Sequence, residues 1–248
     1  MNVINLGLGR ACGPDFGFVA TPQVAGMPAV KAAPTVATRS HLDALFAKID
    51  PARARVIFAI DATASRQPTW DMASKLTAEL FDSAAAIGGL DIQLVYYRGH
   101  GECVASKWLS DAKSLASIMS GVACHAGETQ IGKVLTHAKK ESARKKVGAV
   151  ILISDACEES PSELYNAARE LHDVPVFLFQ EGDDEHVGQI YGQIADITHG
   201  ASCRFDQGAS QRLADLLKAV AAFAAGGVKA LANQNSESAK LLLTQLKK

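Results

Sequence analysis

The sequence predicts an α/β fold with a doubly wound, mainly parallel sheet that carries helices on both faces. Two apolar runs rich in β-branched residues, 56–60 and 147–154, are each followed directly by an aspartate. Runs of this length and composition are typical of strands that are buried on both faces of a sheet. Strand-like and helix-like segments alternate along most of the chain, which favours parallel strands joined by crossover helices.

The elements before residue 128 follow from apolar spacing and from the positions of proline and glycine. The predicted helix 67–87 has Pro68 in its first turn, where proline is tolerated, and two glycines directly after its end. The turn at 99–101 lets the next segment return as an antiparallel edge strand. In order, we expect a helix at 40–49, a strand at 55–60, a helix at 67–87, strands at 91–97 and 102–108, and a helix at 111–119.

The elements after residue 128 continue the same alternation. The segment 130–145 has apolar residues at helical spacing and a basic end, which suits a helix C-terminus. The later expected elements are a strand at 147–154, a helix at 162–172, a strand at 174–179, a helix at 184–196, a strand at 201–206 and helices at 211–225 and 240–248. The last of these is too short to be stable alone in water, so we expect it to dock or to fray.

Composition divides the 248 residues into three regions. Residues 1–38 form an extended arm rich in Gly, Ala, Pro and Val, which is too apolar for a well-solvated tail and is expected to lie on the domain or on a partner. Residues 39–228 form the α/β domain, with a core at about 53–226, and the 48% hydrophobic content of the whole chain suffices for one sizeable core. Residues 229–248 form a linker and the short amphipathic helix.

Charge and cysteine content exclude several classes of protein. The net charge of −1 and the aromatic content of 6% argue against binding to nucleic acid or to an anionic membrane. No apolar run approaches the length of a membrane span, and the first residues lack a secretory pattern. The five cysteines are widely spaced without a Cys-x-x-Cys pair, which favours reduced thiols and a cytoplasmic location.

Oxygen side chains gather in the loop that follows the first buried strand. Asp61 comes directly after the apolar run, and Thr63 and Ser65 follow at alternate positions. Ligands bind at the carboxyl ends of strands in open α/β sheets, and one carboxylate with two hydroxyls suits Mg²⁺. On this loop alone, the alternative is an ordinary strand followed by a helix N-cap.

Two later residues complete a recognisable order. Thr129 lies in a loop before a predicted helix, and Asp155 follows the second buried strand. Across about 53–226, this order resembles the metal-ion-dependent adhesion site (MIDAS) of the von Willebrand factor A (VWA) family, written Asp-x-Ser-x-Ser, then Thr, then Asp. The sequence departs from that pattern once, at Thr63, which retains the hydroxyl. The resemblance implies one Mg²⁺ or Mn²⁺ ion at Asp61, Thr63, Ser65, Thr129 and Asp155.

The resemblance also implies a function. The three hydroxyls contact the metal while the two aspartates act largely through water, which leaves the metal electron-poor and ready for an Asp or Glu of a partner protein. The expected function is therefore a metal-dependent interaction module with no catalytic residues. The lack of an export signal indicates an intracellular bacterial member of the family. Many of these resemble adaptors, and an ATPase or chaperone machine is the expected kind of partner.

Other interpretations remain open at this stage. An apolar strand that ends in Asp also begins haloacid dehalogenase-like Mg²⁺ phosphatases, although their second acid would fall at Thr63, which leaves no group to protonate the leaving group. A VWA-like scaffold that binds no metal is a further alternative. His100 with Cys103, and Cys124 with His125, also offer zinc-type ligands, but nothing in their spacing demands a site.

The neighbours of the site allow more than one role. Glu158 and Glu159 either repel an acidic ligand or face solvent at the start of the next helix, and we favour the helix start because acids are stabilising there. Arg66 either steers an acidic partner or is a plain surface arginine. The acids near Cys157 argue against a catalytic thiol.

Overall fold

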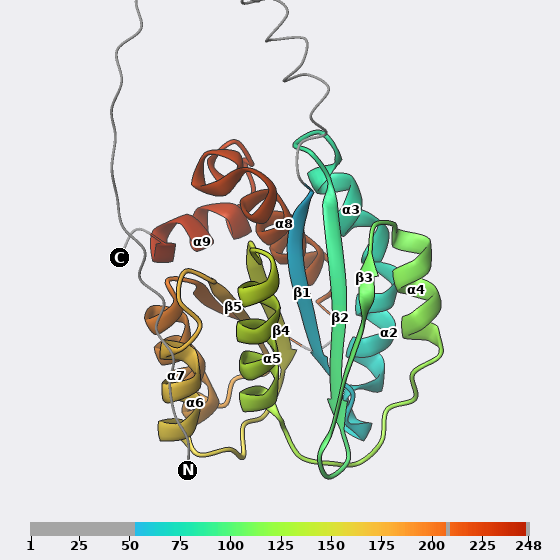
Figure 1. Cartoon of the computed structure of the whole chain (residues 1–248), viewed down its shortest axis with the longest axis vertical. Helices are drawn as coiled ribbons and strands as arrows, with labels where there is room; N and C mark the ends of the chain where they lie inside the picture. The colour runs from blue at the N-terminus through green and yellow to red at the C-terminus, as the bar shows by residue number, and fades with distance from the viewer. Residues whose placement is uncertain (1–52, 207–208, 247–248) are drawn as a thin grey trace, which may run out of the picture. The chain divides into compact units, whose positions relative to one another are not determined.

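The computed structural model describes residues 53–206 and 209–246, and these form a six-stranded sheet in the order β3-β2-β1-β4-β5-β6 (Figure 1). Strand β3 runs antiparallel to β2, and all other neighbouring strands pair in parallel. The predicted fold class and its antiparallel edge strand are therefore confirmed. The strands are β1 (Ala54–Asp61), β2 (Leu90–Arg98), β3 (Glu102–Leu109), β4 (Ala149–Ser154), β5 (Val176–Glu181) and β6 (Ala201–Phe205). The predicted arm 1–38 and helix 40–49 lie outside the described residues.

Helices cover both faces of the sheet, and alternate residues of β1 enter two separate cores. Phe58 packs on one face with α2 (Gln67–Lys75), α3 (Thr77–Ala85), α4 (Ala112–Ser120), α8 (Ser210–Ala232) and α9 (Glu237–Leu246). Ile57 packs on the other face with α5 (Ile131–Arg144), α6 (Pro161–Arg169) and α7 (Glu185–Thr198). Because successive side chains of a strand point to opposite faces, a central strand with a helical layer on each side must be apolar throughout.

The register of the central strands fixes where the candidate site lies. Strand β1 pairs with β4 so that Ile60 lies opposite Ile153, and the two strands therefore end side by side. The polar residues that follow the two apolar runs consequently meet at one edge of the sheet, at the carboxyl ends of its strands.

The helical layer on the α8 face differs from the prediction at two points. The single helix expected at 67–87 is divided at Leu76, which has φ −85° and ψ 0°. The hydroxyl of Thr77 donates to the carbonyl of Ser74 at 3.1 Å, and such bonds compete with the helical ladder and bend helices. Helix α8 continues beyond its expected end to Ala232, across a kink where Gly227 has φ 65°, a value that glycine adopts without strain.

The short C-terminal helix docks on the domain, which was one of its two expected outcomes. Helix α9 starts inside the segment predicted as a linker, and it buries Ala239 and Leu242. The side-chain amide of Gln245 donates to the carbonyl of Ser202 and accepts from its N–H, both at 2.9 Å. The docked helix therefore covers the β6 edge of the sheet with the same pair of hydrogen bonds that a neighbouring strand would make.

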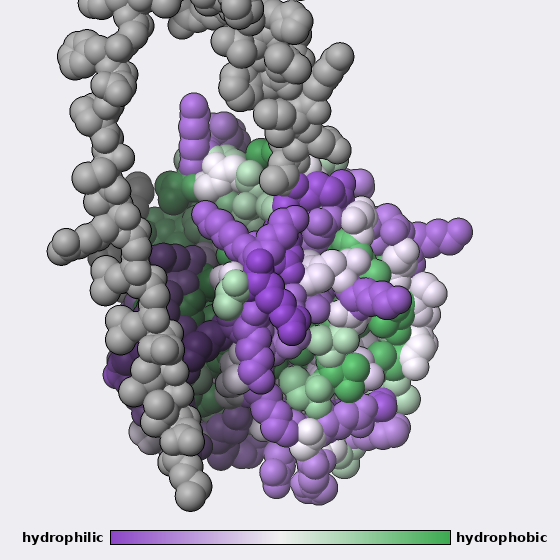
Figure 2. Space-filling model, viewed as in Figure 1, coloured by the Kyte–Doolittle hydropathy of each residue, from purple (hydrophilic) through white to green (hydrophobic). Residues whose placement is uncertain are grey.

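The surface in Figure 2 is viewed from the side of α5. Hydrophilic side chains form a strip over α5, and a more apolar area lies beside it over β2 and β3. Among the described residues, no helix has both the length and the apolar character needed to cross a membrane.

Candidate metal centre

The structure brings the five predicted ligand residues around one hollow of about 250 Å³ at the carboxyl ends of β1 and β4. The loop after β1, the loop before α5 and the loop after β4 each contribute to its wall. Ser65 is exposed, whereas Thr63 and Thr129 are buried. Their role as metal ligands stays a prediction. The residues of that prediction that line the hollow are Asp61, Thr63, Ser65, Thr129 and Asp155.

Asp61 is the most buried acid of the hollow, with 1% of its surface exposed. One carboxylate oxygen accepts from the Thr63 N–H at 2.7 Å, and the other accepts from the Ser154 hydroxyl at 2.9 Å. Burial raises the pKa of Asp61, and these hydrogen bonds counteract the rise only in part. A cation in the hollow would stabilise the charged form of this buried carboxylate.

Asp155 is partly exposed, and a buried arginine binds it from the side. The guanidinium of Arg66 lies 3.0 Å from a carboxylate oxygen of Asp155 and also forms an ion pair with Glu181 at the end of β5. The hydroxyl of Thr69 donates to the same oxygen of Glu181. The expectation of a plain surface arginine was wrong, because only 7% of the Arg66 surface is exposed and its charge is paired inside the domain. Its role in steering an acidic partner stays a prediction.

Thr129 is held by a carboxylate that follows β4. Its hydroxyl donates to Glu158 Oε2 at 2.7 Å, and its backbone N–H donates to the same oxygen at 3.0 Å. The N–H of Glu158 in turn donates to the Thr129 hydroxyl at 3.1 Å. The hydrogen bonds from Thr129 outweigh the effect of burial and lower the pKa of Glu158. Glu158 therefore belongs to the wall of the hollow.

The favoured interpretation of the two glutamates was wrong in detail. Glu159 accepts from the N–H groups of Ile131 and Gly132, so it caps the start of α5 instead of the helix that follows it in the sequence. The physical reason is the expected one, because an acid is stabilising beside the free N–H groups of a helix N-terminus. The sheet places the loop after β4 beside α5, and the glutamates therefore bind there.

Sequence reasoning missed three polar residues beneath the site. Ser154 and Glu181 each end an apolar strand, so they carry the same signal that identified Asp61 and Asp155. Tyr191 donates from its hydroxyl to the carbonyl of Ala156 at 2.9 Å and supports the loop after β4. No signal in the sequence distinguishes this tyrosine from other apolar residues of its helix.

The oxygen set fits a hard divalent cation better than a soft one. Two aspartates and three hydroxyls line the hollow, and Glu158 adds a third negative charge. Arg66 carries one positive charge, so it offsets the three negative charges only in part. Carboxylate and hydroxyl oxygens suit Mg²⁺ and Mn²⁺, whereas thiolate or imidazole ligands would indicate zinc. Within residues 53–206 and 209–246, no group of three or more His, Cys, Asp or Glu side chains is placed to hold a metal ion. Burial raises the pKa of the Cys157 thiol to about 11, so it is protonated at neutral pH.

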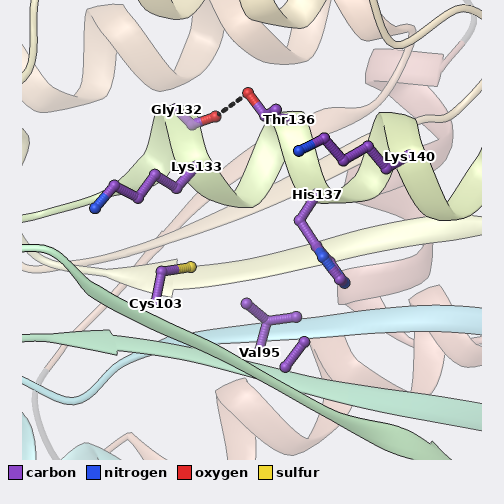
Figure 3. A pocket seen from close by; sticks show the side chains of 8 residues that line it. Val95, Cys103, Gly132, Lys133, Thr136, His137 and Lys140 are labelled. Carbon is purple, nitrogen blue, oxygen red and sulfur yellow. Dashed lines mark hydrogen bonds between the residues drawn. The ribbon is translucent and has the colours of Figure 1, made fainter.

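A second hollow of about 290 Å³ lies between α5 and the β2–β3 hairpin (Figure 3). Its polar groups are largely used within the protein. Lys133 donates to the carbonyl of Gly101 and to the side chain of Gln130, both at 2.8 Å, and a ring nitrogen of His137 lies 2.9 Å from the Gln93 side-chain oxygen. Burial raises the pKa of the Cys103 thiol, so this hollow offers no activated nucleophile.

Comparison with solved structures shows that this is the VWA fold. A von Willebrand factor type A protein from Catenulispora acidiphila aligns with a TM-score of 0.55 at 18% identity, over 70% of this chain and 43% of that one. The SpRpn10 VWA domain aligns with a TM-score of 0.52 at 12% identity, over 68% of this chain and 95% of that domain. The vWF domain of the type V pili tip protein Mfa5 from Porphyromonas gingivalis aligns with a TM-score of 0.55 at 12% identity, over 75% of this chain and 97% of that domain.

The match thus spans less than half of the Catenulispora acidiphila chain but nearly the whole of the two isolated domains. No family model matches the sequence, and a search of curated proteins finds no match. Identities of this size show the fold alone.

Proposed function

We propose that this protein is a metal-dependent protein–protein interaction module. In this proposal, one Mg²⁺ or Mn²⁺ ion is held by Asp61, Thr63, Ser65, Thr129 and Asp155, in the manner of a MIDAS. When bound, the ion supplies an open coordination position for a carboxylate. An Asp or Glu side chain of the partner protein takes that position, and the surface around the hollow supplies specificity.

The observation that carries the proposal is the gathering of five oxygen side chains from three distant loops around one negatively charged hollow. The three hydroxyls give at most three direct oxygens, whereas Mg²⁺ prefers six ligands. Without a cation, Asp61, Asp155 and Glu158 repel an acidic side chain. With a cation, the same hollow attracts it, so binding of the partner should depend strictly on the metal.

The proposal assigns no catalytic activity to the module. The phosphatase alternative needs a second acid at position 63, where the buried Thr63 stands. Residues 182–184 offer the later acidic motif of these phosphatases only superficially, and Asp184 accepts from the N–H groups of His186 and Val187 and caps α7. We further propose a cytoplasmic adaptor whose partner belongs to an ATPase or chaperone machine, with no role in binding nucleic acid or membranes.

The first test measures whether metal and partner share this site. Thr129→Ala is expected to weaken binding of Mg²⁺ or Mn²⁺ by at least about tenfold in titration calorimetry, because it removes a ligand oxygen. Capture of a cytosolic partner by the whole chain should fail in EDTA, return with Mg²⁺, and fail again with Thr129→Ala.

Thr136→Ala is the matched control for this test, because its exposed hydroxyl only donates to the Gly132 carbonyl, at 2.8 Å, on the same helix. It should behave as the wild type does. Absence of any heat and of any thermal shift at millimolar metal would refute the metal site. Partners that bind the wild type and Thr129→Ala equally, with or without chelator, would refute its role in recognition.

A second test separates the module from a phosphatase. We expect no turnover of a generic phosphate ester in the presence of Mg²⁺, because no group at position 63 can protonate the leaving group. Turnover that disappears in Asp61→Asn would instead restore the phosphatase interpretation.

A further inference from the structure

We infer that Glu158 is a positioning residue for the metal, one that acts through the hydroxyl of Thr129. This inference rests on the proposed function and deepens it. Glu158 stands outside the predicted ligand set, yet its carboxylate lines the same hollow. It reaches Thr129 across 29 residues of sequence, from the loop after β4 to the loop before α5.

The contacts between the two residues determine the direction of the hydroxyl. A threonine hydroxyl has one proton and two lone pairs. The proton is donated to Glu158 Oε2 at 2.7 Å, and one lone pair accepts from the Glu158 N–H at 3.1 Å. One lone pair therefore remains, and it is the group that a cation in the hollow requires.

The third contact removes the remaining freedom of the pair. The backbone N–H of Thr129 donates to the same carboxylate oxygen at 3.0 Å, so Thr129 and Glu158 are joined by three hydrogen bonds. Only 5% of the Thr129 surface is exposed, and few other partners can compete for its hydroxyl. Carboxylates that accept a proton from a ligand group fix its orientation and make it a stronger donor to the metal. In the same way, the Glu158 carboxylate would hold the proton of the Thr129 hydroxyl on the side away from the ion.

The adjacent glutamate supplies a matched control. Glu159 carries the same charge at the next position, but it accepts from the N–H groups of Ile131 and Gly132 at the start of α5. A purely electrostatic effect of acidic residues near the hollow should act through both glutamates. An effect that acts through the Thr129 hydroxyl should be much larger for Glu158, whose carboxylate accepts from that hydroxyl at 2.7 Å, than for Glu159.

The test compares Mn²⁺ affinities of the whole chain for the wild type, Glu158→Gln, Glu158→Ala and Glu159→Gln, from the signal of free Mn²⁺ in electron paramagnetic resonance. We expect Glu158→Ala to weaken the affinity by about 10- to 100-fold, the usual range for groups that support a metal ligand. Glu158→Gln should recover part of the loss, because its side-chain oxygen can still accept from Thr129. Glu159→Gln should change the affinity by less than about threefold.

Thermal unfolding without metal checks that each variant is folded, and Mg²⁺ competition gives a second measure of affinity. An unchanged affinity in Glu158→Ala, or a loss in Glu159→Gln as large as that in Glu158→Ala, would overturn the role of Glu158 while the proposed function stood. A wild type that binds no Mn²⁺ would overturn both, so the two failures are distinguishable.

Discussion

Replacing Arg66 with alanine is expected to lower the free energy of unfolding by about 3–5 kcal/mol. The Arg66 side chain is 8% exposed and lies between Asp155 and Glu181, whose side chain is 3% exposed. Among the described residues, removing the guanidinium leaves the Thr69 hydroxyl as the one hydrogen-bond partner of the buried Glu181 carboxylate. A buried charge that loses its partner is much less favourable than the intact pair, because water cannot replace the lost interaction.

Chemical denaturation of the whole chain measures this effect, and Arg169→Ala is the matched control. Arg169 is exposed on α6 and donates to the side chain of Asn166, so its loss should change stability by less than about 0.5 kcal/mol. In the double variant Arg66→Ala/Glu181→Ala the loss should be smaller than the sum of the single losses, because no unpaired charge remains between the two positions. Additive losses would show that the two side chains do not act as a pair.

Replacing Gly127 with alanine is expected to lower stability by about 1–3 kcal/mol and to weaken metal binding as well. A Cβ at this position would lie 2.1 Å from the backbone nitrogen of Gly99 and 2.4 Å from its Cα. The backbone of the β2–β3 turn cannot move aside as a flexible side chain would. The loop that carries Thr129 must therefore shift away from the β2–β3 turn, and the hydroxyl of Thr129 shifts with it.

Gly192→Ala is the control for the Gly127 prediction. Gly192 lies within α7, and a Cβ there would meet nothing within 4 Å. The free energy of unfolding of this variant should rise by about 0.5–1 kcal/mol, because alanine loses less backbone freedom than glycine when it enters a helix. Thermal unfolding and Mn²⁺ titration of both variants are the measurements. A Gly127→Ala protein that unfolds and binds metal as the wild type does would contradict the close approach of the two loops.

The strands and the placement of the candidate site were predictable, because both depend on local sequence. Apolar runs such as 56–60 identify buried strands directly, and polar residues at their ends must meet at one edge of a parallel sheet. The fold class and the antiparallel β3 are confirmed by the structure. The metal itself stays a prediction, as do the boundaries of the three regions.

The interactions that support the site were not predictable, because they join residues that are far apart in the sequence. Arg66 and Glu181 are 115 positions apart, and nothing local to either residue shows that the other will cover it. Glu158 has a similar relation to Thr129, since a glutamate that precedes a helix in the sequence was expected to cap that helix. The break at Leu76 also escaped prediction, because a hydroxyl that bonds to the preceding turn leaves the apolar spacing of the segment unchanged.

The hydrogen bonds of Gln245 make the two ends of the sheet unequal. At β6, one side chain occupies the N–H and the carbonyl of Ser202. At the opposite end, β3 is the terminal strand among the described residues. Within the part of the chain that the structure describes, a strand added at β3 would leave α9 in place, whereas a strand added at β6 would have to displace that helix. For the described residues, two sheets paired through their β3 strands would each end at a β6 edge that α9 covers, so this pairing would not continue into a fibre.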